Sequence, residues 1–268
     1  MAIEKRKLGD FLETQNVPNP KELGWLHTTR SARLIDIINR QKLLAVPCTV
    51  FKDNRGVGEN LCYLFVGRPA YKFNIADPPT SWMLPTVFVF RFSEPPPIKR
   101  IFPFDSGAFA EKRMPSYITE FKLDRFNVGS DKAAVGRLIS IFFKDEKNYF
   151  KRSAVGVSEF KEKHELNFRD MEIEALLNLY HHPRTKDLDE RAATIEIQLE
   201  QNIALDSGDI LGVVVPEEVY RDGELKAALD KLTPVVRPYS IFPLNPDYHY
   251  GLVYEQVQHI YKYYGMLR

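Results

Sequence analysis

The order of the expected secondary-structure elements predicts an α+β fold with mixed or antiparallel β-sheets flanked by helices. Strand, helix, several strands, helix and strands follow one another, with little of the strict alternation that builds a doubly wound parallel sheet. The 268 residues are 44% hydrophobic and 12% aromatic, which is sufficient for one large core. We therefore expect a single domain over 1–268, with its core at about 24–216 and an aromatic C-terminal segment, 234–268, packed on that core.

A short strand followed by an amphipathic helix is expected near the N-terminus. Residues 1–20 form a lead-in that ends in a Pro-Asn-Pro turn signal, and 24–27 are a strand candidate. The segment 31–43 predicts a helix with Ser31 as its N-cap, because apolar side chains recur there at helical spacing. These apolar residues are Leu34, Ile35, Ile37 and Ile38.

Strands make up most of the remaining expected elements. Runs rich in Val, Leu and Phe predict strands over 61–65 and 86–92. Apolar residues at helical spacing predict a helix over 168–180, which ends near a His-His-Pro sequence. Two further strands are expected over 193–199 and 210–215.

The composition and the missing motifs exclude several classes of protein. Lys and Arg total 37 against 36 Asp and Glu, so no global field attracts the chain to nucleic acid. No apolar run is long enough to span a bilayer, no signal peptide is recognisable, and Cys48 and Cys62 suit buried thiols in a reducing compartment. We therefore expect a cytoplasmic protein without a membrane partner. The Rossmann, P-loop, HExxH and GxSxG motifs are absent, and we expect no metal site.

The first segment whose side chains could bind a ligand lies at the end of the first expected strand. His27 is followed there by Thr28 and Thr29, just before the expected helix. A histidine and two hydroxyls at such a corner donate and accept hydrogen bonds suited to a sugar edge. A lone histidine in a core or a cap is the alternative interpretation.

The second segment is YLFVGRPAY, in which a strand runs into Gly67 and Arg68. Glycine allows a ligand to approach the backbone, and the planar guanidinium binds two oxygens of a pyrophosphate or carboxylate at once. Tyr63 and Tyr71 flank this turn, and either ring could stack on a planar ligand. A surface arginine between two packed tyrosines would produce the same pattern.

The third segment alternates polar and apolar residues over 194–199. Its apolar face carries two Ile residues and a Leu, and its polar face places Glu196 between Thr194 and Gln198. A carboxylate held in mid-strand between two hydrogen-bonding neighbours suits catalysis. A solvent-facing strand of an antiparallel sheet would show the same alternation.

Taken in order, these segments resemble the ADP-ribosyltransferase superfamily, especially the bacterial toxin-like branch that includes the DNA-modifying transferases. LHTTRSARLIDII resembles a first strand that carries His and hydroxyl residues and leads into a helix, although Thr28 stands where many members have Gly. YLFVGRPAY is similar to the second, aromatic block, and RAATIEIQ is similar to the strand with the catalytic Glu. The resemblance spans about residues 24–216.

The resemblance implies a glycosyltransferase-class enzyme that splits NAD⁺ and transfers ADP-ribose, with NAD as substrate and no metal. Glu196 would stabilise the positive charge that develops on the ribose, and Arg68 would clamp the pyrophosphate or the acceptor. The residues implied to hold NAD are His27, Thr28, Thr29 and either Tyr63 or Tyr71, one of which would stack on nicotinamide. Such proteins act as toxins or in antiviral defence, which is what the resemblance implies for this chain.

The sequence does not determine the acceptor, and it leaves two other functions open. The acceptor could be DNA or RNA, otherwise protein, a small molecule or water. The tyrosine-rich tail and the basic stretch 144–163 could contact nucleic acid, but the tail's apolar residues favour a helix packed on the core. A catalytically degenerate nucleotide- or nucleic-acid-binding module is the main alternative. A metal-dependent nuclease that uses Asp105, Glu196 and lysines is a further one.

Overall fold

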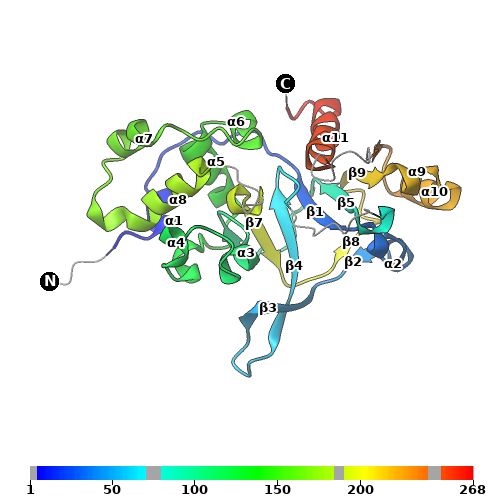
Figure 1. The fold of residues 1–268 in the computed structure, drawn as a ribbon, viewed down its shortest axis with the longest axis horizontal. Coiled ribbons are helices and arrows are strands. Elements are labelled where there is room, and N and C mark those ends of the chain that lie inside the picture. The colour runs from blue at the N-terminus through cyan, green and yellow to red at the C-terminus, as the bar shows by residue number, and fades with distance from the viewer. Residues whose placement is uncertain (1–4, 71–79, 184–189, 241–248, 268) are drawn as a thin grey trace. The chain divides into compact units, whose positions relative to one another are not determined.

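The computed structural model describes residues 5–70, 80–183, 190–240 and 249–267, and the described chain forms two compact units (Figure 1). Unit 1 comprises Met1–Glu22, Thr49–Gly58 and Pro97–Gln198, and unit 2 comprises Leu23–Cys48, Glu59–Pro96 and Leu199–Arg268. Segments of the two units alternate along the sequence, so no single position separates them. The expectation of one domain over 1–268 stays a prediction.

A mixed β-sheet forms the centre of unit 2. Its strands are β1 (Trp25–Arg30), β4 (Gly58–Val66), β5 (Pro85–Phe90), β9 (Ile210–Pro216) and β10 (Val236–Tyr239). They lie in the order β10-β9-β5-β1-β4, with β10 parallel to β9 and every other neighbouring pair antiparallel. Helices flank this sheet, which confirms the predicted α+β class with a mixed sheet.

The central strands of this sheet are buried on both faces. All six residues of β5 are buried, and β9 is buried along nearly its whole length. Their Val and Phe side chains suit a pleated surface that is covered on both sides. Gly24 allows a close approach here, because a Cβ at this position would lie 2.9 Å from the carbonyl oxygen of Phe90.

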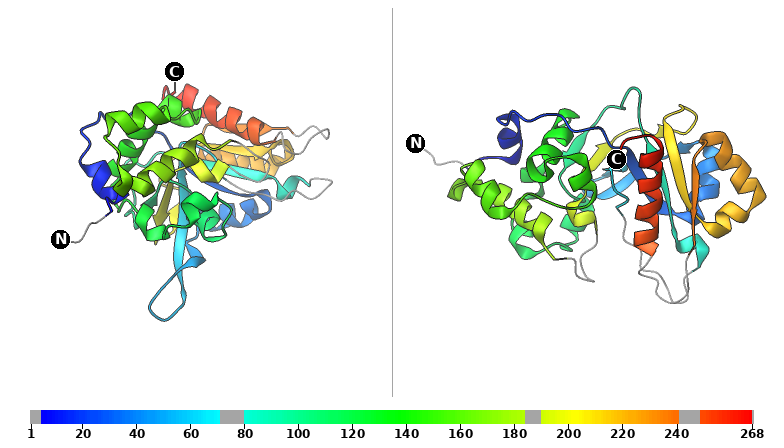
Figure 2. Two further views of the ribbon diagram at one scale, coloured as in Figure 1. Left: turned by 60° about the vertical axis from the view of Figure 1, so that its left-hand side comes forward. Right: turned by 90° about the horizontal axis from the view of Figure 1, so that it is seen from above.

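Helices and one small ribbon complete unit 2. They are η1 (Ser31–Arg33), α2 (Leu34–Arg40), η2 (Ser81–Met83), α9 (Glu217–Arg221), α10 (Gly223–Leu232), α11 (His249–Tyr263) and the antiparallel pair β2 (Lys42–Leu43) and β8 (Ile203–Ala204). Figure 2 shows α11 beside the edge that carries β9 and β10. Val253, Val257 and Ile260 of α11 are buried, and the hydroxyl of Tyr264 donates to the carbonyl of Leu211 at 3.0 Å. The tail therefore packs as a structural helix of this unit.

Unit 1 is mainly helical. Its helices are α1 (Leu8–Glu13), α3 (Ser106–Ala110), α4 (Ser116–Thr119), η3 (Leu123–Phe126), α5 (Ala133–Phe143), α6 (Glu146–Phe150), α7 (Val157–Lys163), η4 (Phe168–Asp170), α8 (Met171–His181) and η5 (Glu190–Ala193). The strand β6 (Arg100–Phe102) pairs antiparallel with β7 (Glu196–Leu199), and β3 (Val46–Lys52) precedes the turn into β4. Aromatic rings pack in its core: the ring centroids of Phe142 and Phe160 lie 4.9 Å apart in a stacked pair, and those of Phe143 and Tyr180 lie 4.8 Å apart in a tilted pair.

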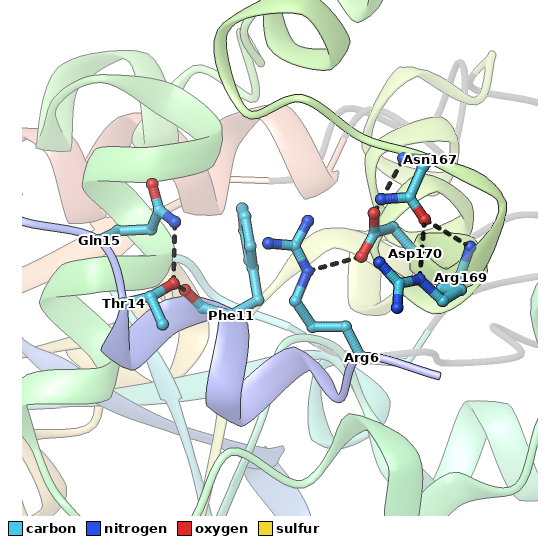
Figure 3. Close-up of polar contacts among 7 residues, drawn as sticks. All are labelled: Arg6, Phe11, Thr14, Gln15, Asn167, Arg169 and Asp170. Carbon is cyan, nitrogen blue, oxygen red and sulfur yellow. Dashed lines mark hydrogen bonds and ion pairs between the residues drawn. The ribbon is translucent and has the colours of Figure 1, made fainter. Parts of the chain in front are cut away.

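The N-terminal helix of unit 1 is anchored by a buried carboxylate (Figure 3). Arg6 Nε donates to Asp170 Oδ1 at 2.6 Å, and its guanidinium lies over the ring of Phe11. Asp170 is buried and also accepts from the backbone N–H of Asn167, which forms a capping box at the start of η4. The segment 1–20 is thus more than a lead-in, because it contributes α1 to the core.

Local details differ from the sequence-based expectations at two places. The prediction that Ser31 caps a helix over 31–43 is wrong, because its hydroxyl donates to the carbonyl of Leu84 at 2.9 Å and lies 2.8 Å from the hydroxyl of Thr86. The helix proper ends at Arg40, and the residues that follow form β2. The strand expected over 193–199 begins only at Glu196, after the turn of η5.

Candidate functional site

The structure distributes the predicted site residues between the two units. In unit 2, β1 carries His27, Thr28 and Thr29, β4 carries Tyr63, and Arg68 follows β4. In unit 1, β7 carries Glu196. Tyr71 lies outside the described residues.

A pocket in unit 2 contains the histidine and both threonines. Its volume is about 610 Å³, within the range of cavities that hold nucleotide-sized ligands. It is formed entirely by 27–46, from the end of β1 through α2 to β2. Its lining residues include His27, Thr28, Thr29, Arg30, Arg33, Asp36, Ile37, Arg40 and Lys42. The structure thus brings three of the predicted ligand-binding residues into one cavity.

His27 is fixed in one orientation by the neighbouring strand. Its Nδ1 lies 3.0 Å from the carbonyl oxygen of Tyr63, so Nδ1–H donates and Nε2 is left as the acceptor. Burial lowers the pKa of His27, and the hydrogen bond to the Tyr63 backbone only partly opposes that effect. The imidazole is therefore neutral at pH 7 and presents an acceptor for a hydroxyl group.

The threonine next to it has unused hydrogen-bonding capacity. Thr28 Oγ1 is buried and has no hydrogen-bond partner within the part of the chain that the structure describes. Thr28 and Thr29 pair through the backbone with Val87 and Thr86 of β5, which holds the end of β1 in place. A ligand hydroxyl or amide would satisfy the buried oxygen of Thr28.

Helical periodicity determines which side chains of α2 line the pocket. Leu34 and Ile38, four residues apart, are buried in the core of unit 2. The pocket is lined instead by Arg33, Asp36 and Arg40, which follow one another at intervals of three and four residues. The helix α2 and the residue before it therefore contribute apolar side chains to the core and charged side chains to the pocket.

Arg68 is fully buried, with 0% of its surface exposed. It follows Gly67, whose φ of 69° lies in the left-handed region and whose N–H donates to the carbonyl of Gly24 at 2.8 Å. The residues that line the pocket do not include Arg68 or Tyr63. A clamp role for Arg68 and a stacking role for Tyr63 stay predictions.

Glu196 is the centre of a buried hydrogen-bond network in unit 1. Its Oε1 accepts from Ser106 Oγ and from Gln198 Nε2, each at 2.7 Å, and its Oε2 accepts from Ser106 N at 3.0 Å. Gln198 is held in turn by Arg100, whose Nη1 donates to Gln198 Oε1 at 3.1 Å. Glu196 is 1% exposed, so the face of β7 that alternation predicts to be polar is enclosed by other parts of the unit.

This environment opposes ionisation of the carboxyl group. Burial, reinforced by the negative charge of Asp105, raises the pKa of Glu196 to about 8, against the opposing effect of hydrogen bonds from Gln198 and Ser106. Asp105 itself caps α3 and lies 3.6 Å from Arg191 Nη1. Such a shifted carboxyl group is typical of functional sites and also of structural networks.

Sequence reasoning missed several residues of these two arrangements. Gln198 is not among them, because alternation along the strand predicted it as a hydrogen-bonding neighbour of Glu196. Arg33 and Arg40 were visible from their spacing of seven residues on the expected helix. Nothing local indicates that Ser106, ninety positions before Glu196, donates two hydrogen bonds to it.

Other kinds of site have no support in the structure. Among the described residues, no group of three or more His, Cys, Asp or Glu side chains is placed to hold a metal ion. No helix in these ranges has the length and apolar character needed to cross a membrane. No family model, curated protein or solved structure matches this chain.

Proposed function

We propose that this chain binds NAD⁺ in the pocket of unit 2, splits the nicotinamide–ribose bond and transfers ADP-ribose to an acceptor. The observation that carries the proposal is that His27, Thr28 and Thr29, which the resemblance implies for NAD, line one pocket of about 610 Å³. Their strand also places Arg30 at the same cavity.

The chemistry of the pocket suits a dinucleotide. The Nε2 of neutral His27 accepts a hydrogen bond from a ribose hydroxyl, and the buried Oγ1 of Thr28 pairs with a second polar group of the ligand. Arg30 contributes positive charge for the pyrophosphate. The reaction itself breaks the C–N bond to nicotinamide, which leaves with the bonding electrons, while the acceptor bonds to the ribose carbon and loses a proton.

Glu196 is the carboxylate proposed to stabilise the positive ribose in the transition state. Only its ionised form carries the required charge, and its pKa of about 8 leaves a minority of molecules in that form at neutral pH. Nicotinamide release should therefore rise with pH between pH 6 and pH 8, as the ionised fraction of Glu196 increases.

The second candidate function is a binding module that holds a nucleotide without cleaving it. The enclosure of Glu196 favours this alternative, because both of its oxygens are occupied by Ser106 and Gln198. A carboxyl group used in this way stabilises unit 1 rather than a transition state. The two functions share the pocket and differ only in turnover.

Nicotinamide release from NAD⁺ by the full chain distinguishes these functions. The assay compares wild type, Glu196→Gln, His27→Ala and the exposed control Glu120→Gln, each with and without DNA, RNA or cell extract. The transferase predicts release by wild type and the control, with a loss of at least about 100-fold in Glu196→Gln. Binding of ADP-ribose without release under any condition refutes the transferase and establishes the binding module. Release that EDTA leaves unchanged shows that the activity, unlike that of a metal-dependent nuclease, needs no divalent metal.

A further inference from the structure

We propose that the pocket selects a dinucleotide that carries a third phosphate in addition to its pyrophosphate, and that Arg33, Arg40 and Lys42, at the two ends of α2, supply the cations for that group. This inference rests on the proposed function, because it assigns the ligand class of the same pocket. It concerns Arg33, Arg40 and Lys42, which the binding of a plain dinucleotide at the end of β1 does not use.

The first argument is the charge of the pocket. Four cations line it, Arg30, Arg33, Arg40 and Lys42, against the single carboxylate of Asp36. The pyrophosphate of NAD⁺ bears one negative charge on each phosphate, and the nicotinamide ring offsets one of them. The formal charge of a plain dinucleotide is thus smaller than that of the pocket lining, whereas an added phosphate monoester brings the two closer together.

The second argument is the spacing of the cations along α2. Arg33 and Arg40 are seven residues apart, which is about 10 Å along a helix axis. Asp36 lies between them on the same face and repels an anion at the midpoint. The phosphates of a pyrophosphate share an oxygen and lie much closer together than this, so the two arginines suit anionic groups at separate positions.

The third argument is that these cations are not engaged in ion pairs within the described part of the chain. Arg33, Arg40 and Lys42 are exposed, and none of them forms an ion pair with any residue that the structure describes. The carboxylate of Asp36 offsets only one of the three positive charges on 33–42. Their charge is therefore available to a ligand.

The test compares two ligands that lack nicotinamide and so cannot be turned over. ADP-ribose and its 2′-phosphate are titrated into the full chain by calorimetry, at low and at physiological salt. We expect the 2′-phosphate to bind about tenfold more tightly at low salt, since two surface ion pairs of modest strength give that factor. The preference should shrink as salt screens the exposed cations.

Charge-neutralising variants locate the added phosphate. Arg40→Gln and Arg33→Gln should each reduce the preference for the 2′-phosphate several-fold and leave the affinity for ADP-ribose unchanged, whereas Arg91→Gln, an exposed arginine of the same unit outside the pocket, should change neither. Inorganic phosphate should weaken the binding of the 2′-phosphate ligand and leave the binding of ADP-ribose unchanged. A free phosphate that binds the pocket equally well with and without saturating ADP-ribose 2′-phosphate would instead identify a separate anion site and overturn the proposal.

Failure of this inference is distinct from failure of the proposed function. Equal affinity for the two ligands, or an equal loss for both in Arg33→Gln and Arg40→Gln, overturns the selection of a third phosphate. Nicotinamide release from NAD⁺ would survive either result. A preference for the 2′-phosphate without any nicotinamide release supports the inference and refutes the transferase.

Discussion

Replacing Glu196 by Gln should change how the stability of the protein depends on pH. The folded state holds the proton of this carboxyl group up to about pH 8, whereas in the unfolded chain it is lost near the ordinary value for Glu. Between these two values the folded state binds more protons, so the free energy of unfolding falls as the pH rises. Glutamine keeps the shape of the side chain and removes this titration.

The magnitude follows from the size of the shift. Each pH unit inside the window costs about 1.4 kcal/mol, and the loss levels off close to the pKa of the folded state. From pH 6 to pH 8 the contribution of Glu196 therefore falls by about 2 kcal/mol. In a chain of this size that corresponds to roughly 5 °C in the melting temperature.

The assay is urea unfolding at a series of pH values between 6 and 9, read as wild type minus Glu196→Gln. The difference removes the contribution of other groups that titrate in this range, including His27, whose pKa lies below its ordinary value. The exposed Glu120→Gln serves as the matched control, because it makes the same chemical change away from the buried network. Parallel curves for wild type and Glu196→Gln would refute the reasoning, because they would mean that the carboxylate is ionised throughout the folded state.

Three further substitutions test the packing around these sites. Gly24→Ala places a Cβ 2.9 Å from the carbonyl oxygen of Phe90, so unit 2 should lose about 1–3 kcal/mol in chemical unfolding, and an unchanged midpoint would show that β1 can shift. Tyr149→Phe removes the hydroxyl that accepts from the N–H of Ile195 at 3.0 Å and should cost about 1–3 kcal/mol. The melting temperature of Tyr149→Phe should therefore lie below that of wild type. Asp170→Asn weakens the anchor of the N-terminal helix by about 1–2 kcal/mol, and hydrogen exchange should quicken in α1 while the sheet of unit 2 keeps its protection.

The sequence predicts the elements whose signal is local. The Val- and Phe-rich run of β5 is found as a strand, because burial on both faces leaves a continuous apolar pattern. The sequence leaves open whether the polar face of β7 is exposed to solvent, because the hydrogen bonds that permit its burial come from Ser106, far away in the chain. Ser31 has the chemistry of a helix cap, but the carbonyl of Leu84 competes for its hydroxyl only after β1 and β5 have paired.

In the candidate site, too, local patterns are predictable from the sequence and contacts with distant residues are not. His27 and its threonines were selected from their position at a strand end, and they do line a pocket. The hydrogen bond that fixes the tautomer of His27 comes from β4 and is invisible in a one-dimensional pattern. Helix periodicity predicts that Arg33 and Arg40 lie on one face of the helix. Only the structure shows that this face lines a pocket.

The alternation of segments between the two units has a consequence for biosynthesis. The sheet of unit 2 contains β1 and β5 from the first third of the chain, but β9 from 210–216 and β10 from 236–239 join it only after nearly the whole polypeptide has been made. A nascent chain therefore carries an unfinished sheet while more than a hundred intervening residues emerge from the ribosome. Expression of either half alone yields fragments of both units and completes neither. Until β9 pairs with it, β5 presents an unpaired strand edge of the kind that invites non-native pairing.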